Sequence, residues 1–243
     1  MSEIPKSHPR YKSLMTRSHL VESAHAGIVS YEGLTSHGRG EAFDYLLGEK
    51  TSVSALAAEK LAARVLLAAK HPVLSINGNT AALAAAEIAD LQKASGAQVE
   101  VNLFHRTDER IAKVSRVLED AGCVLNKGNI ERCVDLPHDR GLCCADGIGS
   151  ADVVLVPLED GDRCEALVSM GKIVITVDLN PIDRTSKMAT LPIVDEVTRA
   201  LPNIAAECRN LAGQAVEMPE IDAKAILKGA ISDMTGYLSH ALD

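Results

Sequence analysis

The stretch KIVITVDLNPIDRTS, residues 172 to 186, decides how this chain is expected to fold. It begins with a short run rich in Val and Ile, which is typical of a strand buried inside a parallel sheet. Three other runs have the same character: PVLSI (72–76), QVEVNLF (98–104) and ADVVLV (151–156). The sequence therefore predicts four parallel strands in the core of one sheet.

Helical periodicity fills the intervals between these strands. Two sets of apolar residues recur at three- and four-residue steps: Ala81, Ala84, Ile88 and Leu91, and then Ile111, Val114, Leu118 and Ala121. Strand and helix in alternation predict an α/β fold with a Rossmann-like, doubly wound, mainly parallel sheet. No strand is evident before residue 71, and residues 9–70 are predicted to be helical, with breaks at Gly38, Gly40 and Gly48.

This pattern suggests how the chain is divided. Residues 1–211 are expected to form a single α/β domain, with a helical amino-terminal part in residues 1–70 and the Rossmann-like core in residues 71–211. A helix from about residue 195 to residue 211 should close the sheet. Residues 212–243 then provide a linker and a last helix.

The composition excludes several classes of protein. With 47% hydrophobic residues in 243, the chain can bury a full core. It has no apolar run of membrane-spanning length, and its start, MSEIPKSHPRYKS, lacks a hydrophobic block, so we expect a cytoplasmic protein. A formal net charge of -8 disfavours a nucleic-acid-binding surface. Any anionic ligand must meet a local basic cluster.

The six cysteines are expected to be reduced and mostly structural, as in cytosolic proteins. Cys133, His138, Cys143 and Cys144 lie close together within residues 126–150, a segment without periodicity that predicts a long irregular excursion. Two adjacent cysteines cannot easily direct both sulfurs at one tetrahedral ion, so a metal site there is disfavoured.

Polar residues follow every predicted strand. They are Asn77 to Asn79, then His105, Arg106 and Thr107, then Glu159, Asp160, Asp162 and Arg163, and finally Asp178 to Ser186. Ligands of doubly wound sheets bind beyond the carboxyl ends of the strands, so Arg106, Arg163 and Arg184 are expected to meet there and bind a polyanion. Helix capping would explain Asn79 and Thr107 without a ligand.

Asp178 ends the fourth predicted strand, where an acid can accept hydrogen bonds from both ribose hydroxyls of a nucleotide. It could instead cap a turn with Asn180. Neither common glycine-rich phosphate loop is present in the sequence, so arginine and hydroxyl groups such as Arg184 and Thr185 would have to hold the phosphates.

The amino-terminal part supplies two more arginines. Arg39 lies between Gly38 and Gly40, just before a predicted helix, so that both its backbone and its guanidinium could approach an anion. Arg17 lies on the first predicted helix, where it could equally be a solvated surface charge.

Six blocks of the sequence together resemble one family. They are IPKSHPRY (4–11), HGRGEAFDYL (37–46), NGN (77–79), VNLFHRT (101–107), VPLEDGDR (156–163) and VDLNPIDRTS (177–186). In order and spacing they are similar to archaeal phosphopantothenate synthetase, also called 4-phosphopantoate beta-alanine ligase, over roughly residues 4–211. The resemblance implies a homodimeric ligase of coenzyme A biosynthesis. Such an enzyme joins 4-phosphopantoate to beta-alanine through a pantoyl-adenylate, converting ATP to AMP and pyrophosphate.

The resemblance also implies where ATP binds. The family's contacts fall on Arg17, Arg39, Asp178, Leu179, Asn180, Arg184, Thr185, Glu196 and Val197. The sequence departs from the family at Glu196, where Asn is expected. This substitution would change the contact with the base, because an ionised carboxylate only accepts hydrogen bonds whereas an amide also donates them. Cys164 stands where Thr is expected, residues 126–150 match poorly, and the residues after 211 carry none of the resemblance.

The chemistry that the resemblance implies needs cations around the phosphates. Arg17, Arg39 and Arg184 are expected to provide them, together with Mg2+, whose protein ligands the sequence does not assign. Asp160 and Asp162 could reach either this metal or the ammonium group of beta-alanine.

Three residues are the candidate catalytic groups, and four are the candidates for binding phosphopantoate. The first set is Arg39, His105 and Arg163, and the second is Asn77, Asn79, Arg106 and Arg163. His37 and His105 could each hold a phosphate or take a proton from the incoming ammonium, or could be structural hydrogen-bonding groups.

Two other functions fit the same strand ends. An NAD-dependent oxidoreductase would use Asp178 on the ribose, although the glycine fingerprint of such enzymes is missing. A protein that binds ATP without chemistry would also keep Asp178. Neither needs a second anion site, so stabilisation by NAD, by ATP, or by ATP with phosphopantoate should separate the three.

Overall fold

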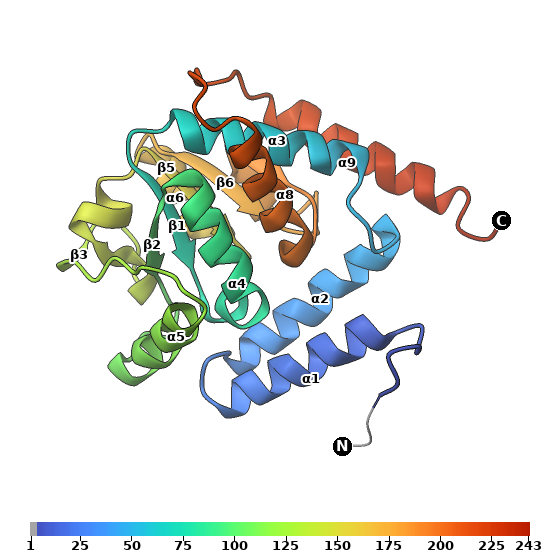
Figure 1. Cartoon of the computed structure of the whole chain (residues 1–243), viewed down its shortest axis with the longest axis horizontal. Coiled ribbons are helices and arrows are strands. Elements are labelled where there is room, and N and C mark those ends of the chain that lie inside the picture. Colours follow the sequence, from blue (N-terminus) through green and yellow to red (C-terminus); the bar gives the residue numbers. More distant parts are fainter. Residues whose placement is uncertain (1–3) are drawn as a thin grey trace.

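The computed structural model describes residues 4–243, and residues 1–3 lie outside the described part. A five-stranded parallel sheet forms its centre, with strands β1 (Pro72–Ile76), β2 (Gln98–Val101), β5 (Val153–Pro157), β6 (Ile173–Val177) and β7 (Leu191–Ile193). Their order is β2-β1-β5-β6-β7. Helices and loops cover both faces of the sheet (Figure 1), which confirms the predicted α/β, Rossmann-like, doubly wound fold.

Side chains that alternate along the strands divide the core into two layers. Leu74 and Leu155 face helices α3 (Val53–Ala68), α4 (Gly78–Ser95), α5 (Asp108–Asp120) and α8 (Val197–Asn210). Val73 and Val154 face the other side, which is covered by α6 (Gly161–Ser169), by the short α7 (Arg184–Met188) and by residues from the segment 126–150. Because both faces are buried, the strands read as continuous apolar runs.

The four predicted strands are confirmed, with β2 ending earlier, at Val101. The fifth strand, β7, was missed because it is only three residues long and contains Pro192. Proline has no backbone N–H, which argues against a central strand, but β7 lies at the edge of the sheet and pairs only with β6.

The amino-terminal part is helical, as predicted, in α1 (Tyr11–His25), α2 (Tyr31–Leu47) and α3. The predicted breaks at Gly38 and Gly40 are wrong, since both lie inside α2. Arg39 therefore lies within a helix and does not precede one. Gly48 does end α2, with a φ of 79° that favours glycine.

The segment 126–150 is more ordered than its sequence suggests. Strands β3 (Ile130–Arg132) and β4 (Leu142–Cys144) pair antiparallel within it. Glu100 of β2 holds the segment against the sheet, because Oε1 accepts from the Cys144 N–H at 2.8 Å and Oε2 from the Ile148 N–H at 2.9 Å. The prediction of a wholly irregular excursion is therefore wrong.

The predicted closing helix is α8, and the last helix is α9 (Ala223–Leu238). Asp233 of α9 accepts hydrogen bonds from the N–H and the hydroxyl of Ser54 on α3, at 2.8 and 2.6 Å. Figure 1 shows α9 lying along α3, far from α5. In residues 4–243 no helix has the length and apolar character needed to cross a membrane.

Candidate active site

A cavity of about 960 Å³ lies at the carboxyl edge of the sheet. Every strand of the sheet sends residues into it: Leu103 to His105 after β2, Asn77 to Asn79 after β1, Leu158 to Gly161 after β5, Asp178 to Asn180 after β6, and Asp195 to Val197 after β7. Helix α2 lies over them with residues between Glu32 and Phe43. The chain has two phenylalanines, Phe43 and Phe104, and both line this cavity.

The strand order reverses between β1 and β5, and the cavity spans that point, where ligands of open α/β sheets bind. We refer to its two sides as the β1–β2 half and the β6–β7 half. The predicted convergence of polar strand ends is therefore confirmed, although some of the side chains differ from those expected.

Asn77 links the ends of β1 and β5, the two strands at the reversal point. Its Oδ1 accepts from the Thr80 N–H at 2.9 Å and caps α4, while its Nδ2 donates to the carbonyls of Pro157 and Leu158, both at 3.0 Å. The cap of α4 is thus Asn77, and the prediction of Asn79 was wrong because the helix begins two residues earlier than a cap at Asn79 would require. Thr107 does cap α5, as predicted.

Asn79 holds α2 over the cavity. Its Nδ2 donates to the Gly33 carbonyl at 2.8 Å, and a Cβ at position 33 would collide with Asn79 Oδ1. The side-chain amides of Asn77 and Asn79 therefore already donate within the protein. What this corner offers a ligand is the amino terminus of α4, where the N–H groups of Gly78 and Asn79 precede the first intrahelical bond.

Asp178 lies in the β6–β7 half and forms the turn with Asn180 that was the alternative to a ribose contact, because its Oδ1 accepts from the Asn180 N–H at 2.9 Å. Burial raises the pKa of Asp178 to about 7, and the negative charge of Asp183 adds to this shift while Arg39 opposes it. Leu179 is buried beside Phe43 and presents an apolar surface to the same half.

Arg184 lies at the rim of the cavity. It pairs with Asp162 and, at 2.5 Å, with Glu165, and its side chain is 60% exposed. Asp162 does not line the cavity. Thr185 is buried, and its hydroxyl donates to the Glu159 carbonyl at 2.9 Å, so it ties the β6 exit to the β5 exit.

Four arginines line the cavity, but only two of them were predicted. They are Arg39, Arg110, Arg140 and Arg184. Arg106 and Arg163, which were expected to join Arg184, do not line it. Arg110 lies on α5 and donates to the Ile28 carbonyl at 3.1 Å and to the His105 carbonyl at 3.0 Å, and Arg140 comes from the segment 126–150.

A buried ion cluster lies beneath the β5 exit and consists of Arg140, Glu159 and Arg163. Arg140 Nη2 bonds Glu159 Oε1 at 2.6 Å, and Arg163 Nη1 bonds Glu159 Oε2. Burial alone would raise the pKa of Glu159, but the two guanidinium groups hold it below its usual value. Arg163 has no exposed surface, so the structure places it under the cavity, not on its surface.

Two histidines line the cavity from opposite halves. His37 of α2 is half-buried, and burial lowers its pKa, which favours the neutral imidazole. His105 is exposed, with Nε2 3.8 Å from a carboxylate oxygen of Glu32. Arg17 of α1 does not line the cavity and pairs with Glu41 of α2 at 3.0 Å.

The family of the chain follows from comparison with known proteins. A model of the phosphopantothenate/pantothenate synthetase family matches residues 54–237. The chain belongs to this family. The resemblance predicted from six sequence blocks is therefore confirmed, and the match continues past residue 211 into α9, so the prediction that these residues carry none of it was wrong.

Several similar proteins are named 4-phosphopantoate--beta-alanine ligase. The protein of Methanospirillum hungatei is 59% identical over 99% of this chain and 100% of its own length. The protein of Methanosarcina mazei is 49% identical over 98% of this chain and 96% of its own, and that of Thermococcus kodakarensis is 48% identical over 87% and 82%.

Glu196 is the position where this member of the synthetase family carries an acid and Asn was expected. Its Oε2 caps α8 by accepting from the Thr198 N–H at 3.0 Å and from the Thr198 hydroxyl. An acid and an amide can both cap a helix through an oxygen, so the substitution keeps the start of α8, and with it Val197, in place.

No group of three or more potential metal ligands occurs among residues 4–243. Asp160 is nevertheless suited to a cation. Its Oδ1 caps α6 through the Arg163 N–H at 2.9 Å, whereas its Oδ2 is buried without a hydrogen-bond partner among the same residues. Mg2+ usually takes one or two carboxylates besides phosphate oxygens, and Asp160 on the cavity surface fits that pattern.

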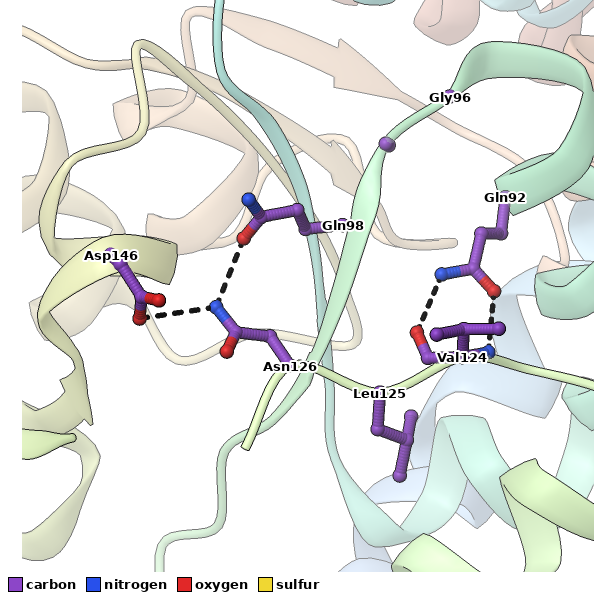
Figure 2. Close-up of a pocket in the computed structure, with 8 residues that line it drawn as sticks. Gln92, Gly96, Gln98, Val124, Leu125, Asn126 and Asp146 are labelled. Carbon is purple, nitrogen blue, oxygen red and sulfur yellow. Dashed lines mark hydrogen bonds between the residues drawn. The ribbon is translucent and has the colours of Figure 1, made fainter. Parts of the chain in front are cut away.

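A smaller pocket of about 420 Å³ lies at the amino end of β2 (Figure 2). Gln92 donates to the Val124 carbonyl at 2.7 Å and accepts from the Val124 N–H at 2.8 Å. Asn126 donates to Gln98 at 3.0 Å and to Asp146 at 3.4 Å. These polar groups bond one another and lie at the opposite edge of the sheet from the active-site cavity.

Proposed function

We propose that this chain is a ligase that joins 4-phosphopantoate to beta-alanine, with ATP converted to AMP and pyrophosphate, in the synthesis of coenzyme A. The relatives that carry this name match almost the full length of the chain. The observation that supports it most is the cavity itself, which is lined by all five strand exits and by four arginines. Such a cavity has room for two anionic ligands together.

ATP would occupy the β6–β7 half. Its ribose hydroxyls would donate to Asp178, and its base would lie between Leu179 and the start of α8 at Glu196 and Val197. Arg39 suits the phosphates because its guanidinium is exposed at the cavity and bonds only the Ser36 hydroxyl, at 3.4 Å, among the described residues. Arg184 and Asn180 lie on the same side.

Phosphopantoate would occupy the β1–β2 half. Arg140 and Arg110 line this half, and the free N–H groups at the amino terminus of α4 face the same space. Arg163 would act indirectly, because it shares Glu159 with Arg140 and so fixes where the Arg140 guanidinium lies.

The two halves would bring two anions into line for reaction. A carboxylate is a poor electrophile, so the pantoate carboxylate oxygen would attack the α-phosphorus of ATP and pyrophosphate would leave. The amine of beta-alanine would then attack the acyl carbon, release AMP and form the amide. Orientation of reactants can lower such a barrier by roughly 7 to 11 kcal/mol, and Arg39 and Arg184 would offset the repulsion between them.

Mg2+ bound at Asp160 would neutralise phosphate charge during this transfer.

The incoming ammonium of beta-alanine must lose a proton before its nitrogen can attack the acyl carbon. His105 is exposed in the β1–β2 half and can accept that proton. We further propose that the protein is cytoplasmic and homodimeric, and the family resemblance supports the homodimer.

An end-point assay of AMP tests this function. The enzyme should form AMP with ATP, beta-alanine and 4-phosphopantoate, and far less with unphosphorylated pantoate. With ATP and phosphopantoate but no beta-alanine, labelled pyrophosphate should exchange into ATP. If the complete mixture forms AMP but no exchange occurs in the mixture without beta-alanine, the adenylate would be ruled out.

Arg39→Ala tests the nucleotide site. It should abolish AMP formation and leave the fold intact, because Arg39 is exposed and makes no ion pair within residues 4–243. Arg116→Ala is the matched control, since Arg116 is an exposed arginine of α5 away from the cavity. Normal turnover in the Arg39 variant would remove this residue from the mechanism.

A further inference from the structure

Glu59 is a carboxyl group buried behind the β7 exit. It lies on α3 and has no exposed surface. Its Oε2 accepts from Asn203 Nδ2 of α8 at 2.9 Å, whereas its Oε1 accepts from no donor in the described part of the chain. Asp195 and Arg199 precede Asn203 by two turns and one turn of the same stretch of chain, and burial together with the carboxyl group of Asp195 raises the pKa of Glu59.

Asp195 already has its own donors. Its Oδ2 accepts from the Thr51 hydroxyl at 2.6 Å, and its Oδ1 from Arg199 Nε at 2.9 Å and from the Glu196 N–H at 2.7 Å. Asp195 lines the active-site cavity directly before the first residues of α8. Its position therefore fixes the backbone at Glu196.

Glu59 forms no ion pair with a cation among residues 4–243. Arg199 is the nearest one, and it pairs with Asp195 at 2.7 Å and with Asp44 of α2 at 2.5 Å. Two neighbouring ionised carboxylates, one of them with an unpaired oxygen, would repel each other strongly in a buried environment. A proton on Glu59 removes the repulsion and supplies the missing hydrogen bond. Burial accordingly raises the pKa of Glu59 to about 8.

We propose that Glu59 is a positioning residue of the nucleotide site: as a neutral carboxylic acid it donates a hydrogen bond to Asp195 and so holds the start of α8 where the base binds. The inference rests on the proposed function, because it takes Glu196 and Val197 as the base contacts. Arg199 carries the effect further, since it joins Asp195 to Asp44 and thus links α8 to α2 over the cavity.

Loss of the proton would place two negative charges side by side. The groups that face Glu59 are Asp195 and Arg199 at the β7–α8 junction and Asn203 of α8, with Asp44 of α2 beyond Arg199. Among residues 4–243, none of them donates a hydrogen bond to Oε1. Asp195 would therefore be displaced at alkaline pH, and ATP would bind less tightly, whereas the β1–β2 half would be unaffected.

Glu59→Gln separates this role from a merely structural one. The amide is isosteric, its oxygen can accept from Asn203, and its NH2 can donate to Asp195 without titrating. The dissociation constant for ATP is measured by calorimetry from about pH 7 to about pH 9.5 in wild type, in Glu59→Gln, and in Glu217→Gln, which changes an exposed carboxyl in the linker before α9.

The three proteins should bind ATP equally at pH 7. Above pH 8 the wild type and the linker control should lose up to about tenfold per pH unit, while Glu59→Gln stays level. The same alkaline loss in Glu59→Gln would overturn the inference. Failure of wild type to bind ATP at pH 7 would instead overturn the proposed function.

Infrared spectroscopy provides a second readout that does not depend on the nucleotide. A protonated carboxylic acid has a carbonyl stretch distinct from that of a carboxylate and of an amide. At pH 7 this band should be present in the wild-type spectrum and reduced in that of Glu59→Gln. Identical spectra in this region would show that Glu59 is ionised, which contradicts the inference.

Discussion

Two buried glutamates lie behind the two halves of the cavity, and their pKa values are shifted in opposite directions. Glu159 is bonded to Arg140 and Arg163, which hold its pKa low, whereas Glu59 pairs with no cation in residues 4–243 and burial raises its pKa to about 8. The side chains are equally inaccessible, so partners and not burial decide the charge. In the proposed function, the half with the ion cluster receives a phosphorylated acid, while the neutral carboxyl supports the uncharged base.

Glu159→Gln tests the first part of this contrast and should have the largest effect. The substitution leaves the guanidinium groups of Arg140 and Arg163 without their carboxylate. Breaking a buried ion pair in this way costs about 3 to 5 kcal/mol of unfolding free energy, which urea denaturation would measure.

The control for Glu159→Gln is Asp90→Asn, which removes an ion pair with Arg209 whose side chains are about half exposed. This change should cost less than about 1 kcal/mol. If both variants were equally stable, the buried cluster would matter no more than a surface pair.

Arg140→Met asks whether the ion cluster also serves the second substrate. The variant keeps one arginine on Glu159 and retains an apolar stem of similar length. We expect the KM for phosphopantoate to rise about tenfold to a hundredfold, because a charge-assisted hydrogen bond contributes roughly 1.5 to 3 kcal/mol, with little change in the KM for ATP. Equal changes in both KM values would assign Arg140 to the support of the whole cavity.

The sequence predicted the site residues at one strand exit but missed an arginine that reaches the cavity from a distant segment. The β6 exit could be predicted because Asp178, Asn180 and Thr185 follow one strand directly, and the parallel sheet fixes where that strand ends. Arg140 could not be predicted, since it reaches the cavity from the segment 126–150 only because Glu100 anchors that segment to β2. Such a contact leaves no local periodicity.

The prediction that Arg163 lines the cavity failed for a different reason. It lies one helical turn from Glu159, close to the strand exit, but the first turn of α6 directs it inward, where it pairs with Glu159 and bonds the Ser75 hydroxyl at 3.1 Å. Arg110 lies on the turn of α5 that faces the cavity. The sequence placed charged residues near the right edge but could not tell which face of each helix would point there.

Asp178 provides an intermediate case between the two glutamates, with a pKa of about 7 set by burial and by Asp183. Above pH 7 its carboxylate can accept from both ribose hydroxyls, and on protonation it loses acceptor capacity. The affinity for ATP should therefore fall by up to about tenfold per pH unit below 7. Calorimetry would measure it, and Asp178→Asn should bind weakly with a flatter profile. A pH-independent affinity in the wild type would separate Asp178 from the ribose.

The smallest effect expected is on the pH dependence of stability, and it concerns Glu59. Its folded pKa of about 8 lies above the ordinary value of 4.5, so between these two pH values the folded protein holds a proton that the unfolded chain has lost. The stability of the wild type must therefore fall as pH rises through this window, and level off above pH 8. Glutamine does not titrate and avoids this loss.

The Tm of Glu59→Gln should accordingly rise relative to wild type between about pH 5 and pH 8, by at least about 2 to 4 °C, which corresponds to about 1 kcal/mol for a chain of this size. Differential scanning calorimetry of both proteins in matched buffers gives the difference directly. Because Glu159 has a lowered pKa, its contribution has the opposite sign and is lost toward acid, so the two residues can be told apart. A constant Tm difference across the window would mean that Glu59 is ionised when folded, like Glu159, and the contrast between the two sites would disappear.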